Sequence, residues 1–319
     1  MQKQTNHIKM SHQLRLTGLF LVLFTCLLFS CQSVTSDPDE QYTVTFSVSN
    51  YQQISFDDLS ASGTRAVSSD HPTTLAHLLI AVFDAETGEQ ACAPIQHNQS
   101  DYTTEDKWDD YPKFSLTLPY GRYRILILGF NGSQKCNITS VNQISWENDY
   151  VPNTFYYCEE FTFDKNASLE QKITLKHAVT AFRVETSDVI PAEVKKMRFS
   201  STVGGTVLDA TTGFTPQSTG RTSDVTVLEQ YVGKSSTFTV YLFLPSEEQV
   251  TSTYSVQALG QNDNVLYEKH FNDVPLRINV LTVWQGKLFE ASSADVEEHN
   301  AGISLYWDTK WEDTINLNP

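Results

Sequence analysis

FSLTLPYGRYRILILGFN, residues 114–131, is the stretch that decides the fold class. Its first part, FSLTL, alternates apolar and polar residues, which is the pattern of a strand with one buried face. Pro119, Tyr120 and Gly121 favour a turn, and the almost continuous apolar run over residues 123–130 predicts a returning strand that is buried on both faces. The stretch therefore predicts two strands joined by a tight turn.

The same alternation recurs along the chain. In YTVTFSVS, residues 42–49, apolar residues stand two apart with Thr and Ser between them, and residues 261–264 favour a hairpin turn because Asn and Asp tolerate positive φ. PAEVKKMRF, near Pro191, offers one or two helical turns at most. Short strands at regular intervals predict an all-β chain of sandwiches. Further strands are predicted in LLIAVFDAETGEQACAPI, FYYCEEFTF, QKITLKHAVTAFRVET, STFTVYLFLP, STYSVQALGQNDNVLYEKHF, LTVWQGKLFE and GISLYWDTKWEDTINL.

The chain is long enough for two domains. The two series of strands meet near residues 176–179, which predicts an N-terminal β-sandwich domain over residues 42–176 and a C-terminal β-sandwich domain over residues 177–319. Residues 200–223 are rich in Thr, Gly and Ser, and they predict a long loop or an irregular hairpin inside the second domain.

The first thirty residues have the layout of a secretory signal. Lys3, Lys9 and Arg15 precede an apolar run over residues 16–29, and no basic cluster follows it. A permanent transmembrane helix needs about 20 apolar residues, so we expect residues 1–30 to be removed. An ordinary signal peptide cut near Ser33 is the alternative.

Leu28, Phe29, Ser30 and Cys31 resemble the lipobox of bacterial lipoproteins. The resemblance implies that the peptide is cut before Cys31 and that this cysteine carries the lipid. Several acyl chains give a durable anchor, whereas one chain gives only a marginal one. Residues 31–41 would then form a polar tether, and SDPDE within it is similar to the acidic export tag of Bacteroidetes surface lipoproteins, although a soluble linker has the same composition.

Composition excludes several classes of function. The formal net charge is −16, which argues against a nucleic-acid partner and against docking on anionic lipid through charge. Past Cys31 three cysteines remain, so at least one is free, and no CxxC spacing predicts a zinc or redox site. These cysteines are Cys92, Cys136 and Cys158.

No catalytic, cofactor-binding or metal-binding residue is predicted. The common nucleotide, metalloprotease and nucleophile motifs are absent from the sequence. Acidic pairs, as in Asp109 and Asp110, are the residues that a glycosidase needs, but a chain with 38 acidic residues contains such pairs by chance. The other pairs are Asp57 with Asp58 and Glu159 with Glu160.

Several loose motifs together resemble one family along most of the chain. They are the lipobox, the alternating strand after it, GTRA, LTLPYGRYRILILGFN, ITLKHAVTAFRV and FNDVPLRINVLTVWQGKLF. With these the chain is similar to the FimB-type fimbrial anchor subunits of Bacteroidales. The resemblance implies two transthyretin-like β-sandwich domains in tandem and a lipid-anchored, surface-exposed protein of the outer membrane. It also implies a place at the base or the tip of a type V fimbrium.

The resemblance further implies how such a protein finds its partners. In the wider fimbrillin family an arginine-specific protease removes the lipid and the first strand, and the groove accepts a strand from another subunit. Arg65 and Ala66 follow a small polar stretch that a protease could reach. If the bond stays uncut, the chain remains a tethered anchor subunit with fimbrial subunits and the membrane as partners. A host or bacterial surface ligand is a further partner that the resemblance leaves open.

A surface glycan-binding or adhesin lipoprotein without a fibre role is the alternative reading. It would need exposed aromatic side chains on which sugars can stack. The residues for that role are Trp108, Tyr111, Trp284, Trp307 and Trp311. Aromatic residues are more often core residues than ligand contacts.

Overall fold

The computed structural model describes residues 40–51, 75–102, 107, 109–290 and 303–307, without the side chains of residues 50, 51 and 303–307. Within these ranges the elements are strands, with three short 3-10 turns, so the all-β prediction is confirmed. The described residues from Gln41 onward belong to one compact unit. No helix among the described residues has the length and apolar content that spanning a membrane requires.

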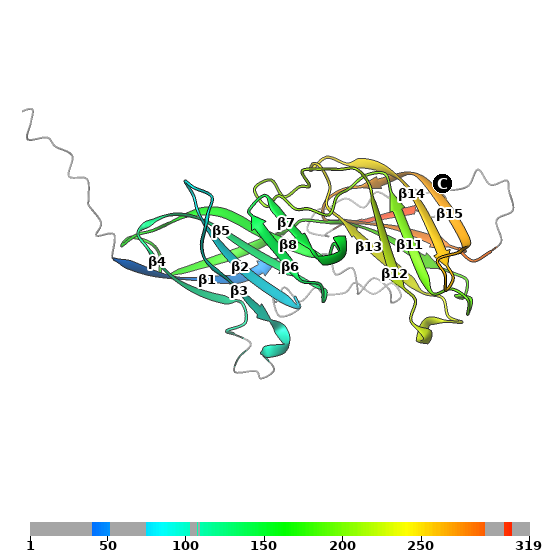
Figure 1. Ribbon diagram of the computed structural model, residues 1–319, viewed down its shortest axis with the longest axis horizontal. Helices are drawn as coiled ribbons and strands as arrows, with labels where there is room; N and C mark the ends of the chain where they lie inside the picture. Colours follow the sequence, from blue (N-terminus) through cyan, green and yellow to red (C-terminus); the bar gives the residue numbers. More distant parts are fainter. Residues whose placement is uncertain (1–39, 52–74, 103–106, 108, 291–302, 308–319) are drawn as a thin grey trace, which may run out of the picture. The chain divides into compact units, whose positions relative to one another are not determined.

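The first part of the chain builds a seven-stranded sheet in the order β3-β2-β5-β8-β9-β1-β4 (Figure 1). Strands β8 and β9 pair at only two positions, Phe155 with His177 and Tyr156 with Lys176. The sheet therefore folds over at this point, and β9, β1 and β4 pack across from β2, β5 and β8. The bounds are β1 (Gln41–Tyr51), β2 (His77–Asp84), β3 (Gln90–Asn98), β4 (Lys113–Pro119), β5 (Gly121–Phe130), β8 (Thr154–Phe163) and β9 (Glu170–His177).

Strand β5 is buried on both of its faces, as the apolar run predicts. One face contributes Ile125 and Ile127 to the core of the folded sheet. The other face contributes Leu126 and Leu128 to a second cluster, which also contains Trp146. That cluster is completed by the hairpin of β6 (Cys136–Ser140) and β7 (Gln143–Trp146) and by residues from later in the chain, Ala178, Val179, Leu208, Ala210 and Phe243.

The second part of the chain builds two four-stranded sheets that enclose a third hydrophobic core. Sheet D has the order β13-β10-β16-β17, and sheet F has the order β12-β11-β14-β15. Alternate residues such as Phe182 and Trp284 point from sheet D toward Phe271 and Tyr254 of sheet F. The bounds are β10 (Thr180–Thr186), β11 (Lys196–Ser201), β12 (Arg221–Thr226), β13 (Thr237–Leu242), β14 (Val250–Leu259), β15 (Val265–Leu276), β16 (Val280–Gly286) and β17 (Ile303–Trp307).

The chain passes from the first sheet to sheet D between His177 and Thr180. Buried His177 marks this point: its Nδ1 lies 2.8 Å from Oδ1 of Asn279, and its Nε2 lies 2.6 Å from Oδ1 of Asn153. Its ring stacks on Phe155 with 4.4 Å between centroids. The change of sheet falls where the sequence predicts a junction, and the division into domains 42–176 and 177–319 remains a prediction.

Several local predictions can now be compared with the structure. Residues 260–264 join β14 to β15 as the predicted hairpin turn, with Asp263 at φ 56°. Residues 202–220 form the irregular connection of the β11–β12 hairpin, also as predicted. PAEVKKMRF, in contrast, supplies the start of β11 after one turn, because Met197 and Phe199 alternate into the core. The hairpin of β6 and β7 has no counterpart among the sequence predictions.

Candidate functional site

The candidate site is the place that β1 occupies in the first sheet. Strand β1 pairs with β4 in antiparallel register, from Gln41 opposite Pro119 to Ser47 opposite Lys113. On its other side it pairs with β9 in parallel register, beginning with Thr45 opposite Glu170. It is therefore an interior strand, and among the described strands β4 pairs with β1 alone. We call the space between the facing edges of β4 and β9 the β1 slot.

The buried face of β1 fills the core beneath the slot. Val44, Phe46 and Val48 have at most 1% of their surface exposed. The Phe46 ring lies 5.4 Å from Phe161 and 6.3 Å from Phe163, centroid to centroid. Burial of an apolar side chain of this size contributes about 1.5–3 kcal/mol, so these three contribute on the order of 5–9 kcal/mol. Loss of β1 would expose a deep apolar groove.

The outer face of β1 is held by hydroxyl groups. The Oγ1 atoms of Thr43 and Thr117 are 2.8 Å apart, and Oγ1 of Thr45 lies 2.9 Å from Oγ of Ser115. Each pair stands directly opposite in the antiparallel register. Such exposed cross-strand pairs contribute only about 0.2–1 kcal/mol each. The affinity of the slot for a strand is thus set by the apolar face, while the backbone hydrogen bonds fix its register.

The contacts that hold β1 join it to residues far away in the sequence. The pair Thr43 and Thr117 is separated by 74 positions, and Oγ of Ser49 donates to the carbonyl oxygen of Ile173 across 124 positions. In the covalent chain, β1 reaches the later strands only through residues 52–74. A single cut in that segment would leave β1 bound by non-covalent contacts alone.

The other residues predicted for the site are not covered by the structure. The lipid-attachment residue Cys31 and the lipobox residues Leu28, Phe29 and Ser30 lie outside the described residues. The same holds for Arg65 and Ala66, the predicted protease site. Their roles remain predictions.

The aromatic residues of the alternative reading divide into two groups. Tyr111 is fully buried, and its hydroxyl donates to the carbonyl oxygen of Leu75 at 2.6 Å. Trp284 is 3% exposed and contributes to the core between sheets D and F. Neither side chain can stack on a sugar. Trp108 and Trp311, and the side chain of Trp307, lie outside what the structure describes.

Two of the three acidic pairs lie among the described residues, on separate elements of the chain. Glu160 is paired with two arginines of β5, with its carboxylate 3.2 Å from Arg122 and 2.5 Å from Arg124. Asp109 and Asp110 lie on an exposed turn, and the pair Asp57 and Asp58 lies outside the described residues. Over the described ranges, no three His, Cys, Asp or Glu side chains come together as metal ligands would.

The three described cysteines are all free thiols. Burial raises the pKa of Cys136 to about 12 and that of Cys158 to about 11, and it also raises the pKa of Cys92. Thiolate is the reactive form of cysteine, so these thiols are chemically inert at neutral pH. They are half-buried small apolar residues: Cys92 packs against the core of the first sheet, and Cys136 and Cys158 pack against the cluster that contains Trp146.

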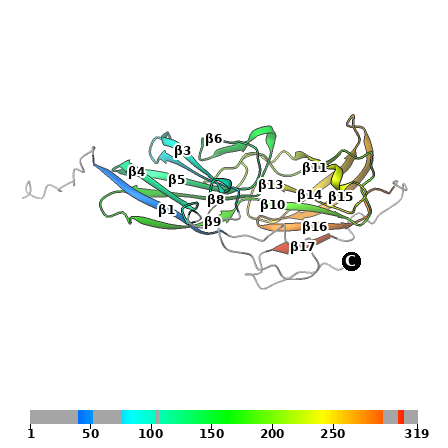
Figure 2. The same ribbon diagram turned by 90° about the horizontal axis from the view of Figure 1, so that it is seen from below.

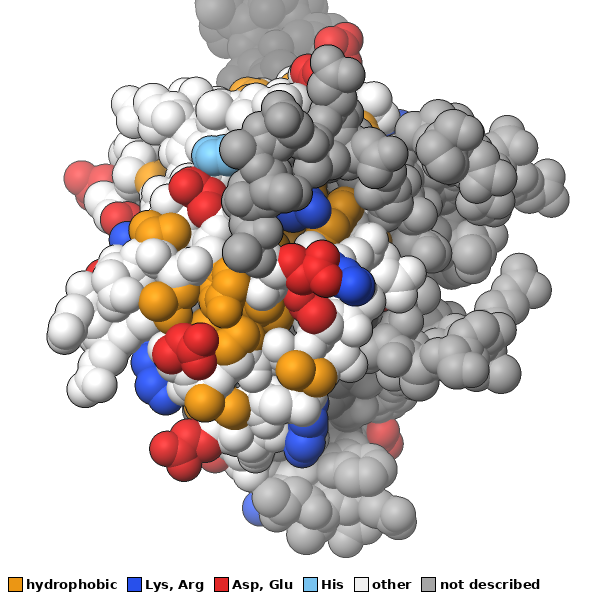
Figure 3. Space-filling view, turned by 90° about the vertical axis from the view of Figure 1, so that its right-hand side faces the viewer, with side chains coloured by type: hydrophobic (Ala, Val, Ile, Leu, Met, Phe, Trp, Pro, Cys, Tyr) orange, Lys and Arg blue, Asp and Glu red, His pale blue; other side chains and the backbone are white. Residues whose placement is uncertain are grey.

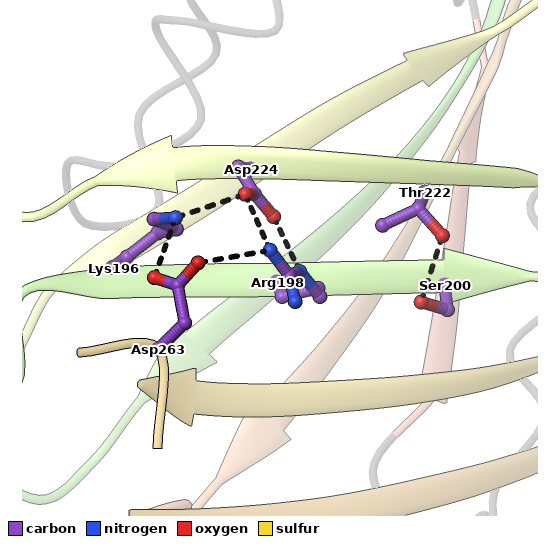
Figure 4. A network of polar contacts seen from close by, with 6 residues as sticks. All are labelled: Lys196, Arg198, Ser200, Thr222, Asp224 and Asp263. Carbon is purple, nitrogen blue, oxygen red and sulfur yellow. Dashed lines mark hydrogen bonds and ion pairs between the residues drawn. The ribbon is translucent and has the colours of Figure 1, made fainter. Parts of the chain in front are cut away.

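A network of charged side chains covers part of the outer face of sheet F (Figure 4). Nε and Nη2 of Arg198 donate to both carboxylate oxygens of Asp224 at 2.8 and 2.9 Å. Nζ of Lys196 donates to Asp263 at 2.8 Å and lies 3.2 Å from Asp224. Because these groups pair with one another and are partly exposed, the network orders the surface of the sheet and contributes little to stability.

Apolar side chains are exposed at the end of the second sandwich where β10 stops. Val189 follows β10, Leu228 and Tyr231 lie between β12 and β13, and Val265 begins β15, each between 43 and 57% exposed. Figure 3, which looks onto the right-hand side of Figure 1, shows hydrophobic side chains mixed with acidic and basic ones. Such a mixed surface is typical of the protein surface in general.

The sequence predicts β1 as a strand but not the slot around it. Alternation identifies the face of β1 that is buried, through Val44, Phe46 and Val48. The neighbours β4 and β9 are chosen by contacts between residues that are far apart in the sequence, and no local pattern in a single sequence encodes these. The parallel pairing with β9 is therefore information that only the structure supplies.

Three solved structures are similar to this chain at low identity. A candidate adhesin from Bacteroides ovatus is 10% identical, with a TM-score of 0.44, over 73% of this chain and 83% of that chain. A fimbrial assembly protein from Parabacteroides distasonis is 12% identical, with a TM-score of 0.38, over 83% and 94%. The tip fimbrial protein Mfa3 from Porphyromonas gingivalis, with C-terminal truncation, is 11% identical, with a TM-score of 0.36, over 83% and 98%. No function of this chain follows from likenesses at this level.

Comparison with curated proteins gives no match. A family match covers residues 34–317, which include every described strand and the candidate site. The description of that family is "Family of unknown function (DUF6562)". Because the match extends over most of the sequence, this chain belongs to the family of unknown function DUF6562.

Proposed function

We propose that this chain is a lipid-anchored subunit of an outer-membrane fimbrium, at its base or its tip, and that it assembles with other subunits by β-strand addition. One observation carries the proposal. Strand β1 is an interior strand with a fully apolar inner face, and residues 52–74 are its sole covalent link to the later strands. A strand held in this way is the kind of element that one chain can exchange with another.

The two fates of the chain follow from whether the bond between Arg65 and Ala66 is cut. An uncut chain keeps β1 in its slot and keeps Cys31, so it remains closed on that side and tethered to the membrane. A cut chain loses both, and the edges of β4 and β9 become free to pair with a strand from another subunit. We propose the uncut form, because the sequence resembles the anchor subunits. Two tandem transthyretin-like domains, 42–176 and 177–319, belong to the same proposal.

Intact mass and N-terminal peptide mapping of the protein from washed outer membranes test the anchoring. We expect an acylated Cys31 in a chain that is continuous through Arg65 and Ala66. Cys31→Ser should abolish acylation and release the protein from the membrane, whereas the matched control Cys92→Ser should change neither. A mature terminus at Ala66 without lipid would contradict the anchor role.

Strand exchange is tested with a separate peptide. A specific protease site placed within residues 52–74 allows β1 to be cut and removed under mild denaturation, and a labelled peptide of residues 41–51 is then added back. We expect saturable binding that Phe46→Asp in the peptide abolishes, because Phe46 enters the core. Thr45→Asp is the matched control on the exposed face and should bind with little loss. Equal binding of both variants, or none of the unchanged peptide, would contradict strand addition at this slot.

Copurification distinguishes a fimbrial subunit from a surface protein that has no role in a fibre. The chain isolated from membranes should bring down other fimbrial subunits, and loss of β1 contacts should change which subunits it retains. Binding to surface glycans with no retained subunit would instead favour the alternative reading.

A further inference from the structure

The connection between β11 and β12 contains an arm, residues 204–215, that leaves the second sandwich and contacts the first part of the chain. A long irregular connection usually runs over the surface, and its residues are then exposed. Much of this arm is buried instead. The buried residues are Gly204, Gly205, Leu208, Ala210, Gly213 and Thr215.

The middle of the arm pairs with the hairpin of β6 and β7. The N–H of Leu208 donates to the carbonyl oxygen of Ile144 at 2.8 Å, and the N–H of Ile144 donates to the carbonyl oxygen of Leu208 at 3.1 Å. The N–H of Ala210 donates to the carbonyl oxygen of Val141 at 2.9 Å. Reciprocal bonds of this kind are those of an antiparallel pair. The arm therefore adds a further strand-like segment alongside β7.

The side chains of the same segment enter the core on the outer side of β5. Leu208 has no exposed surface and Ala210 has 1%. Both belong to the cluster that contains Leu126 and Leu128 of β5 and Trp146 of β7. The arm is thus held to the first part of the chain by apolar burial as well as by backbone hydrogen bonds.

The tip of the arm is a tight turn that lies against β8. The N–H of Asp209 donates to the carbonyl oxygen of Phe214 at 2.8 Å, and the N–H of Gly213 donates to that of Asp209 at 2.7 Å. Gly213 has φ 82°, and a Cβ at this position would overlap the phenol oxygen of Tyr156 in β8. Only glycine allows the turn to approach β8 so closely.

Both ends of the arm are bonded to the second sandwich. The N–H of Gly205 donates to the carbonyl oxygen of Phe243 at 3.1 Å, and the N–H of Thr215 donates to that of Leu244 at 2.8 Å. Phe243 and Leu244 follow β13 directly. The Phe243 ring also stacks on Trp146, with 5.9 Å between centroids. The arm therefore makes ordered contacts on both sides.

Without the arm, the covalent join between the two parts is short. Strand β9 leads into β10 through residues 178–179 (Figure 2). Compact parts that are joined by a short linker open independently unless they share a large apolar interface. The bonds of His177 to Asn153 and Asn279 add a polar link at this join. The apolar contacts of the arm supply the larger shared surface.

We propose that the arm is a brace that makes the first sheet and the second sandwich open as one cooperative unit. This inference does not rest on the proposed function. If the first sheet opens, Leu208 loses its buried site. If the second sandwich opens, the ends of the arm lose their bonds to Phe243 and Leu244. Opening of either part therefore breaks contacts that stabilise the other.

Hydrogen exchange of the folded full-length chain at increasing urea concentrations tests this coupling. Peptides that cover β5 and β8 report the opening of the first sheet, and peptides that cover β11 and β14 report that of the second sandwich. We expect the slowest amides of both sets to give equilibrium constants for opening that agree within about twofold, with the same dependence on urea.

A double substitution in the arm should uncouple the two parts. Leu208→Ser removes the apolar anchor, and Gly213→Val pushes the turn away from Tyr156. We expect the opening constants of the two sets of peptides to differ at least about tenfold in this variant.

The matched control makes the same two changes inside the second sandwich. Leu276 has no exposed surface and lies in the core between sheets D and F. Gly233 has φ 75°, and a Cβ there would meet nothing within 4 Å. Leu276→Ser with Gly233→Val should accelerate exchange, but by the same factor in both sets of peptides.

Two outcomes would overturn the proposal. Different opening constants for the two sets in the unchanged chain would show that the two parts are independent. Equal constants in the variant with Leu208→Ser and Gly213→Val would show that the arm does not couple them. Gly213→Val alone, with Gly233→Val as its control, is a milder pair for use if the double variants do not fold, and the same expectations apply to it.

Discussion

Phe46→Ala is the substitution that most directly measures how strongly the β1 slot binds its strand. Phe46 has no exposed surface and lies in ring contact with Phe161 and Phe163. Truncation of a buried Phe to Ala costs about 3–5 kcal/mol, through lost burial and through the cavity that remains. Urea unfolding should show this loss as a lower midpoint with an unchanged slope.

The matched control is Thr45→Ala on the other face of the same strand. Its hydroxyl pairs with Ser115 at an exposed position, so its loss should cost less than about 1 kcal/mol. In a chain cut within residues 52–74, the Phe46→Ala penalty should reappear as weaker binding of the β1 peptide by roughly 150-fold to 5,000-fold. A penalty for Phe46→Ala no larger than that for Thr45→Ala would refute the view that the apolar face holds β1.

Three further predictions concern other parts of the fold. Burial lowers the pKa of His177 from 6.5 to about 4. Between pH 6.5 and pH 4 this histidine is therefore protonated in the unfolded chain and neutral in the folded chain. The free energy of unfolding should fall by about 1.4 kcal/mol for each pH unit of acidification through that window. His177→Gln should remove this part of the pH dependence, which is measured by urea unfolding at pH 7 and pH 5. An equal loss of stability between these pH values in both proteins would contradict the prediction. Gly129→Ala should cost about 1–3 kcal/mol of stability in the same assay, because the added Cβ would lie 2.6 Å from Leu75 and 2.9 Å from Leu175, and an unchanged midpoint would show that the core yields. Asp224→Asn should cost about 0.5–1 kcal/mol at low salt and less at 1 M salt, and a loss independent of salt would rule out an ionic origin.

The fold class could be predicted because strands carry their own signal. The alternation in β1 and the apolar run in β5 reflect burial that each strand imposes on its own sequence. The start of β11 was harder to predict, since Pro191 and the charged residues after it favour a turn. The hairpin of β6 and β7 gave no signal, because its burial comes from a cluster assembled with residues such as Leu208 and Phe243.

In the candidate site, too, local sequence patterns predict some features, whereas others depend on the tertiary fold. Sequence alone predicts the strand, which the structure confirms, and a resemblance predicts protease and lipid positions that stay predictions. Sequence alone does not identify the role of aromatic residues. Tyr111 and Trp284 are of a residue type that can stack on a sugar when exposed, yet both are buried. Burial of a single aromatic residue depends on which strands pack above it, and that is decided by the tertiary fold.

The parallel pairing of β1 with β9 has a mechanical consequence. Strand β9 leads through Ala178 and Val179 directly into β10 of sheet D. Because β1 runs parallel to β9, β1 also runs toward sheet D from its first residue, Gln41. A force that pulls on the chain before Gln41, while the second sandwich is held, drags β1 backwards along its own axis. Its hydrogen bonds to β4 and β9 are then loaded in shear and must rupture together, whereas a force across the sheet would open them one at a time. The strand direction therefore makes the pairing of β1 most resistant to a force that acts along the axis of the strand.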